Sequence, residues 1–103
     1  MRGPYRQGTC VNPILPSKWD WEPNHLVRNS RYRVVKPFTD ADGDTHGVGE
    51  EWVFISATFS KFDDLLTLCL RRSFDEEWTL PLLWKKGEQE EVIEDFGTHM
   101  KRI

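Results

Sequence analysis

The spacing of apolar residues predicts a short β-strand at residues 31–38. Tyr32, Val34 and Phe38 alternate with Arg33, Val35 and Pro37. This period of two is typical of a half-buried strand. Pro37 indicates the end of the strand or an edge position, because proline lacks the N–H that a central strand needs. The segment that follows, residues 39–50, is acidic and rich in glycine, so we expect no strand or helix to run through it.

Three more strands are predicted between residues 51 and 84. Residues 51–59 are rich in aromatic and β-branched types, which favour strands. Strict alternation would place Trp52 and Phe54 on one face and Val53, Ile55, Ala57 and Phe59 on the other. Residues 65–72 alternate with their inward positions at Leu66, Leu68 and Leu70. Residues 78–84 alternate with Trp78, Leu80, Leu82 and Trp84 on one face, and Pro81 indicates an edge.

The pattern changes to a helical period near the end of the chain. Apolar residues recur at steps of three and four in residues 88–100, at Val92, Ile93, Phe96 and Met100. Glutamates in the first turn suit the positive end of the helix dipole. Gly97 is expected to weaken or end this helix near residues 97–99.

The first part of the chain has a different composition. Four of the six prolines fall in residues 1–30, and proline disfavours regular structure with internal hydrogen bonds. We therefore divide the chain into an extended, proline-rich N-terminal arm, residues 1–25, and a single domain, residues 26–103. A fifth short strand is expected from residues 26–30 or from the arm.

Short antiparallel strands followed by one helix predict a mainly β fold, because such a sheet must bend or close to protect its edges. We expect a small SH3-like, partly open antiparallel barrel of four to five strands. One C-terminal α-helix covers an opening, and the extended N-terminal arm packs outside.

One stretch resembles a small bacterial domain family of unknown function. The resemblance rests on a D-x-D-G-x-x-H-x-x-G-E-x-W signature at residues 40–52, preceded by Tyr32-x-Val34 and Phe38 and followed by Phe62-Asp63-Asp64 and Leu66-Thr67-Leu68. It covers about residues 26–100 and implies one compact domain of bacterial origin. It implies no activity.

Charge and cysteine content limit the classes of partner and compartment. The net charge is −3, but residues 1–36 carry +5 and residues 37–103 carry −8. An acidic body repels phosphates, which argues against nucleic acid. No apolar run is long enough for a membrane span. Cys10 and Cys69 are too few for a disulfide framework, so we expect a reducing, cytoplasmic location.

The acidic loop is the clearest candidate for cation binding. If Asp40 takes position 1 of a calcium-binding EF-hand loop, then Asp42, Asp44 and Glu51 fall at ligand positions. Thr45 stands where that loop requires glycine, and the flanking segments are strands rather than helices. The spacing therefore favours an exposed hairpin loop whose rim, formed by Asp40, Asp42, Asp44 and His46, is the first place for a polar or cationic ligand.

Catalysis finds little support in the sequence. No nucleophile elbow, phosphate-binding glycine loop or zinc motif is present, so no cofactor is expected. A Cys69–His46 dyad is conceivable, but a cysteine between leucines on a strand is typical of a structural residue. An enzyme of unknown chemistry remains an alternative.

Aromatic residues favour a role in recognition, because small barrels bind extended peptides in aromatic-lined grooves. We predict a non-catalytic protein- or peptide-binding module, with a homodimer formed through the arm as one form of it. The arm itself carries a P-x-x-P-x-K segment at residues 13–18 that suits such a groove. The candidate binding residues are Asp40, Asp42, Asp44, His46, Trp52, Phe62 and Trp78.

Overall fold

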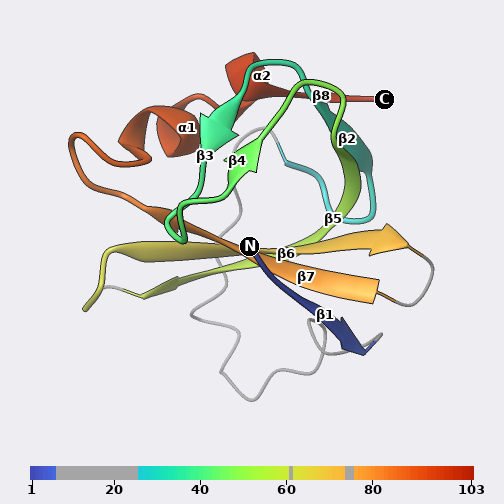
Figure 1. Ribbon diagram of the computed structural model, residues 1–103, viewed down its shortest axis with the longest axis horizontal. Helices are drawn as coiled ribbons and strands as arrows, with labels where there is room; N and C mark the ends of the chain where they lie inside the picture. The colour runs from blue at the N-terminus through green and yellow to red at the C-terminus, as the bar shows by residue number, and fades with distance from the viewer. Residues whose placement is uncertain (7–25, 61, 74–75) are drawn as a thin grey trace.

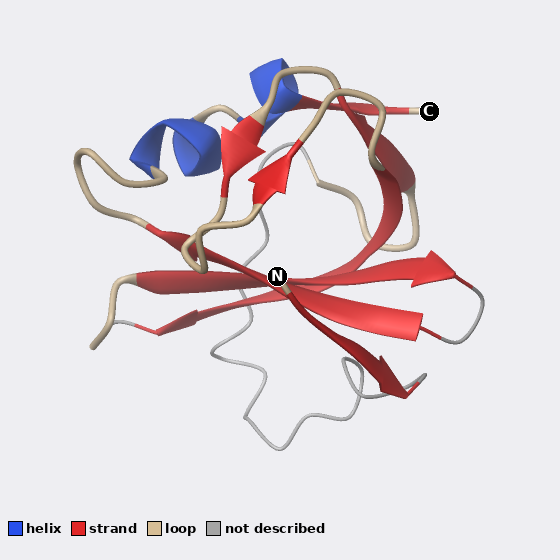
Figure 2. Ribbon diagram, in the orientation of Figure 1, coloured by secondary structure: helices blue, strands red, loops and turns tan. Residues whose placement is uncertain are grey.

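The computed structural model describes residues 1–6, 26–60, 62–73 and 76–103. Figures 1 and 2 show a strongly curved antiparallel sheet with two short helices and a small hairpin over one face. The sheet has six strands in the order β1-β7-β6-β5-β2-β8. These strands are β1 (Arg2–Arg6), β2 (Arg31–Val34), β5 (Glu51–Ser60), β6 (Leu65–Ser73), β7 (Glu76–Leu83) and β8 (Met100–Arg102). The hairpin is β3 (Phe38–Thr39) with β4 (Thr45–His46), and the helices are α1 (Glu90–Glu94) and α2 (Phe96–His99).

The centre of the sheet is the meander β5–β6–β7, as the alternating pattern predicts. Leu66, Leu68 and Leu70 of β6 are fully buried, and the residues opposite them on β5 and β7 are buried or partly buried. Burying one leucine side chain contributes roughly 1.5–3 kcal/mol, so this row anchors the core. The turn between β5 and β6 closes with Asp64 in the left-handed conformation, at a φ of 52°.

A β-bulge in β5 corrects the predicted faces of this strand. The register with β6 shifts between Phe54 and Ser56, so one extra residue lies in β5 and the alternation reverses beyond it. Ala57 and Phe59 therefore share the core face with Trp52 and Phe54, instead of lying opposite them. Such a bulge also bends its strand, and β5 pairs with β2 in its first part and with β6 over the rest.

The predicted C-terminal helix is correct in its buried residues and wrong in its length. Val92, Ile93, Phe96 and Met100 are all buried. However, Asp95 adopts non-helical angles (φ −144°, ψ 60°) and separates α1 from α2. Met100 is extended and begins β8, which pairs with β2. A three-residue strand is too short for periodicity to reveal it.

The β3–β4 hairpin lies where no regular structure was expected, and β1 lies where a fifth strand was one of two expectations. Residues 39–50 contribute most of the β3–β4 hairpin, in which Phe38 pairs with His46 and Thr39 with Thr45. The start of the predicted arm forms β1 and pairs with β7, so the fifth strand of the prediction comes from the arm. The P-x-x-P-x-K segment, residues 13–18, lies outside the described residues.

The coarse fold class is confirmed and the finer one is not. The structure is mainly β and antiparallel, but the six-stranded sheet ends in two edges, β1 and β8, and the described strands do not close a barrel. The expected SH3-like barrel is therefore not supported. Among the described residues, no helix is long and apolar enough to cross a membrane.

Candidate functional site at the acidic turn

The acidic turn between β3 and β4 lies beside the start of β1, along the same edge of β7. Arg2 pairs with Thr79, and two residues further along β7 the carbonyl oxygen of Pro81 accepts a hydrogen bond from the Ala41 amide (2.8 Å). Proline offers no N–H on this side, so β7 can use only its carbonyl here. β7 is not the edge strand that Pro81 indicated, because β1 lies outside it, but β1 stops short of Pro81 and the acidic turn takes its place there.

The turn is organised by the carboxylate of Asp40. Its Oδ1 atom accepts hydrogen bonds from the backbone amides of Asp42 (2.9 Å) and Asp44 (3.1 Å), an arrangement for which aspartate is favoured in turns. Gly43 has a φ of 88°, a left-handed conformation that glycine adopts without strain. The D-x-D-G-D pattern is thus a turn that positions three carboxylates.

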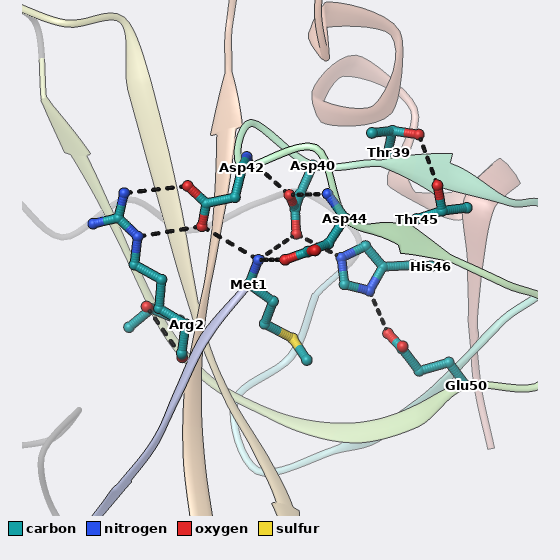
Figure 3. Close-up of polar contacts among 10 residues, drawn as sticks. Met1, Arg2, Thr39, Asp40, Asp42, Asp44, Thr45, His46 and Glu50 are labelled. Carbon is teal, nitrogen blue, oxygen red and sulfur yellow. Dashed lines mark hydrogen bonds and ion pairs between the residues drawn. The ribbon is translucent and has the colours of Figure 1, made fainter.

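The α-ammonium group of Met1 occupies the cluster of aspartates (Figure 3). Its nitrogen lies 2.7 Å from Oδ2 of Asp40, 3.3 Å from Oδ2 of Asp42 and 2.5 Å from Oδ2 of Asp44. An ammonium group has three N–H donors and ionised carboxylates only accept, so each aspartate can receive one hydrogen. The Asp40 side chain is fully buried, whereas that of Asp44 is 58% exposed.

The charge states of the cluster follow from these contacts. Burial lowers the pKa of the Met1 amine, but hydrogen bonds to Asp40, Asp44 and Asp42 outweigh this effect and raise it from 8.0 to about 10. Burial raises the pKa of Asp40, but the Met1 ammonium and His46 outweigh burial and lower it. Hydrogen bonds from Arg2 are the main cause of the lowered pKa of Asp42. The amine is therefore a cation between anions at neutral pH.

Arg2 adds a second cationic contact from the same strand. Its Nε and Nη2 atoms each lie 3.2 Å from one oxygen of Asp42, a two-point geometry suited to a carboxylate. The Arg2 side chain is 71% exposed, so solvent screens this pair and its contribution is small. The first two residues thus hold the acidic turn through the amine and, less strongly, the guanidinium.

His46 lies beneath the turn rather than on its rim. The side chain is 2% exposed and stacks on Phe38, with ring centroids 5.0 Å apart. Its Nε2 atom lies 2.8 Å from Oδ2 of Asp40, and its Nδ1 atom lies 2.6 Å from Glu50. Two ionised carboxylates can only accept hydrogens, so both ring nitrogens must donate and the ring is an imidazolium.

The pKa directions agree with this assignment. Burial lowers the pKa of His46, but hydrogen bonds to Glu50 and Asp40 outweigh burial and raise it. Burial raises the pKa of Glu50, and the contact with His46 outweighs burial and lowers it. With both ring nitrogens engaged, His46 offers no lone pair to a metal ion or a substrate. Its chemistry in this arrangement is electrostatic.

The other predicted site residues lie apart from the acidic turn. Trp52 is fully buried in the core, and Phe62 is 98% exposed at the β5–β6 turn. Glu51 pairs with Arg33 at 3.0 and 3.1 Å. Within the part of the chain that the structure describes, the carboxylates that a single ion could reach are those of Asp40, Asp42 and Asp44, whose oxygens lie within 4.8 Å of one another.

Trp78 lies beneath β1 and limits what can occupy residue 3. A Cβ atom built on Gly3 would lie 2.9 Å from ring atoms of Trp78 and 2.9 Å from the carbonyl oxygen of Glu77. Gly3 also has a φ of 148°, which disfavours other residues. The guanidinium of Arg72 lies 5.7 Å from the centroid of the Trp78 ring.

Sequence reasoning missed Met1, Arg2 and Gly3 as parts of the site. No local pattern connects them to the acidic turn about forty residues away. The excess of positive charge in residues 1–36 over an acidic body was the one available signal, and it indicated attraction without indicating the place.

Cys69 does not carry a free thiol. It is disulfide-bonded in the structure, so it cannot serve as the nucleophile of a Cys69–His46 dyad. Disulfides persist mainly in oxidising environments, so the cysteines do not support the expected reducing, cytoplasmic location. The other cysteine of the sequence, Cys10, lies outside the described residues.

Comparison with known proteins supports the fold alone. No family model matches the chain, and no curated protein matches it. The chain is similar to a solved structure of an integron cassette protein from the mobile metagenome of Vibrio cholerae, with a TM-score of 0.77 and 18% sequence identity. The similarity covers 86% of this chain and 99% of the cassette protein. The likeness supports the mainly β fold of this chain.

Proposed function

We propose that this protein is a peptide-binding module whose acceptor site is the edge of β7 together with the acidic turn. The ligand class is an extended segment that begins with a free α-amino group. The observation that carries the proposal is the Met1 ammonium held by Asp40, Asp42 and Asp44 while β1 pairs with β7. In the described structure the chain's own first residues occupy the acceptor.

Two recognition modes combine in this arrangement. Addition of a strand to a sheet edge provides affinity through backbone hydrogen bonds, and capture of a chain terminus fixes its position. Here the edge of β7 provides the first, and three carboxylates aimed at one nitrogen provide the second. The Met1 side chain packs against the core cluster, so an apolar first residue adds buried area.

The site also implies a preference along the segment. Position 2 faces the carboxylate of Asp42, which favours arginine or lysine. Position 3 requires glycine, because any side chain would collide with Trp78. We therefore expect the site to accept a peptide beginning Met-Arg-Gly and to reject one with an acylated first residue.

The test uses a full-length chain whose own β1 cannot dock. The Gly3→Val variant forces a Cβ atom against Trp78 and the Glu77 carbonyl, which should free the acceptor. The matched control is Gly47→Val, since a Cβ atom on Gly47 would meet nothing within 4 Å. A fluorescent hexapeptide with the sequence of residues 1–6 is titrated into each chain and its anisotropy is measured.

We expect the hexapeptide to bind the Gly3→Val chain and not the Gly47→Val chain, where β1 blocks the site. An Nα-acetylated hexapeptide should bind at least about tenfold more weakly, since it loses a charge-assisted contact of roughly 1.5–3 kcal/mol. Absence of binding to a folded Gly3→Val chain, or equal binding of both peptides, would rule out the proposed function.

A second copy of the chain is the partner that most closely matches the acceptor. If two copies exchanged β1, each would make the contacts seen within one chain, which is the usual route to a strand-swapped homodimer. Sedimentation of the full chain and of a chain lacking residues 1–25 tests this idea. A change from the mass of a dimer to that of a monomer after deletion supports self-association. A monomer in both cases excludes it.

Cation binding remains a second candidate because the oxygens of Asp40, Asp42 and Asp44 lie within 4.8 Å of one another. Calcium prefers such carboxylate oxygens, but in the described arrangement it would have to displace the Met1 ammonium. Calcium titration of the Gly3→Val and Gly47→Val chains, followed by melting temperature, separates the cases. An unchanged melting temperature at millimolar calcium in both chains would exclude the cation hypothesis.

A further inference from the structure

The Met1 amine has no spare hydrogen that a substituent could replace without the loss of a contact. Each of its three hydrogens can point to a different aspartate, and the Met1 side chain is 7% exposed. An acyl group on this nitrogen would remove the positive charge, reduce three donors to one and add at least one carbon and one oxygen within the cluster. The Asp40 carboxylate, fully buried, would then lose one of its two cationic partners.

We propose that the α-amino group of Met1 is a modification site that controls whether β1 is docked. A free amine closes the acidic turn onto β1; an acylated amine cannot enter, and β1 leaves the edge of β7. The inference goes beyond the proposed function, because it concerns the chain's own amine and holds whether or not another peptide binds.

The docked and acylated states exclude one another chemically. Acylation by an acyl thioester requires the neutral amine: its lone pair attacks the carbonyl carbon, the N–C bond forms, and the C–S bond breaks. One proton passes from nitrogen to the departing sulfur, which leaves as a thiol. A docked ammonium has no lone pair to offer, so acylation captures only the undocked state and docking protects the amine.

The weak contacts of the rest of β1 explain why release should extend along the strand. Beyond the amine, β1 is held near its start by the exposed Arg2–Asp42 pair and by irregular pairing with β7, whose register shifts between Arg2 and Tyr5. Exposed pairs contribute little. Loss of the amine therefore removes the buried ionic contact of the strand.

The experiment uses full chains made by ligating a synthetic thioester of residues 1–9 to a recombinant chain that begins at Cys10. Three versions carry a free amine, an Nα-acetyl group or a desamino first residue, and the recombinant part is labelled with ¹⁵N. Amide hydrogen exchange is then measured at residues 76–79, which face β1, and at residues 66–70 as an internal reference.

With the free amine, we expect slow exchange at residues 76–79. With the acetyl group or the desamino residue, exchange there should be at least about tenfold faster while residues 66–70 remain unchanged. Equal exchange in the free and acetylated chains would overturn the proposal. Full protection in the desamino chain would overturn it as well, because the charge would then be unnecessary.

Two variants of the free-amine chain keep the proposal testable if a chain with a modified first residue fails to fold. Asp44→Asn, in the free-amine chain, removes the most exposed carboxylate of the cluster and should speed exchange at residues 76–79 severalfold. Lys101→Gln removes an exposed positive charge from β8 and should change nothing. If Asp44→Asn has no effect on exchange at residues 76–79, the amine does not control β1 and the proposal fails.

Discussion

Asp40 and His46 are joined through the carboxylate oxygen that also accepts from the Met1 ammonium. Oδ2 of Asp40 lies 2.8 Å from Nε2 of His46 and 2.7 Å from the Met1 nitrogen, while Oδ1 accepts the two backbone amides of the turn. One buried carboxylate therefore couples the core-side histidine, the turn and the first strand (Figure 3). A substitution in any of the three should therefore change the stability of the other two.

Replacing His46 with phenylalanine should destabilise the protein by about 3 kcal/mol, because Asp40 and Glu50 would lose the cation between them in a buried site. The ring shape and the stacking on Phe38 are kept, so the loss reports the charge. The matched control is His99→Phe, which removes one hydrogen bond to the Asp95 carbonyl and should cost about 1 kcal/mol. Urea unfolding measures both; equal losses would refute a charged His46.

The stability of this network should be greatest between about pH 4.5 and pH 6.5. The pKa of His46 is raised, so its contribution is complete below 6.5 and is lost as pH rises through the raised value. The pKa values of Asp40 and Glu50 are lowered, so their contributions are complete above 3.8 and 4.5 and are lost in acid. Unfolding measured across this range should show both declines, and His46→Phe should abolish the one on the alkaline side.

The docking of β1 should weaken between pH 8 and pH 10. The pKa of the Met1 amine is raised from 8.0 to about 10 in the folded chain, so its contribution is complete below pH 8 and is lost as pH rises through 10. The fluorescence of Trp78, which lies against Gly3, should change over this interval. The Gly3→Val chain serves as the control and should show no such change; an identical change in it would place the titration elsewhere.

Asp40→Asn and Asp44→Asn should differ strongly although both remove one partner of the amine. Asp40 is fully buried and contacts Met1, His46 and two backbone amides, so its loss should cost about 3 kcal/mol. The Asp44 side chain is 58% exposed, so its replacement should cost less than about 1 kcal/mol. Thermal or urea unfolding compares the two chains. Similar losses would contradict the special role of Asp40.

Periodicity predicted the centre of the fold because β6 alternates from Leu65 to Arg71, and Leu80 and Leu82 of β7 lie opposite its buried leucines. Alternation located the buried leucines of β6, and the helical spacing found the buried face of α1 and α2. It failed in β5, where one bulged residue reverses the faces, and at β8, where three residues give no period. These features depend on tertiary pairing, which local pattern does not contain.

Part of the candidate site could be predicted from the sequence. Asp40, Asp42 and Asp44 were found as a cluster of carboxylates, because spacing alone brings them together in a turn. Their occupant was not found, since Met1 reaches them only through the pairing of β1 with β7. His46 was predicted at the rim and lies buried, because the salt link to two carboxylates lets a charged ring be buried.

The carbonyl of Pro81 has a consequence for the alignment of any strand on β7. Because the Ala41 amide occupies this carbonyl, the acidic turn is a fixed stop beyond Thr79, and a strand cannot slide past it. A strand shifted by one residue would also turn every side chain to the opposite face. In the proposed acceptor, the first nitrogen of a bound segment would therefore have a fixed position, and the site would select where a segment begins as well as which residues it contains.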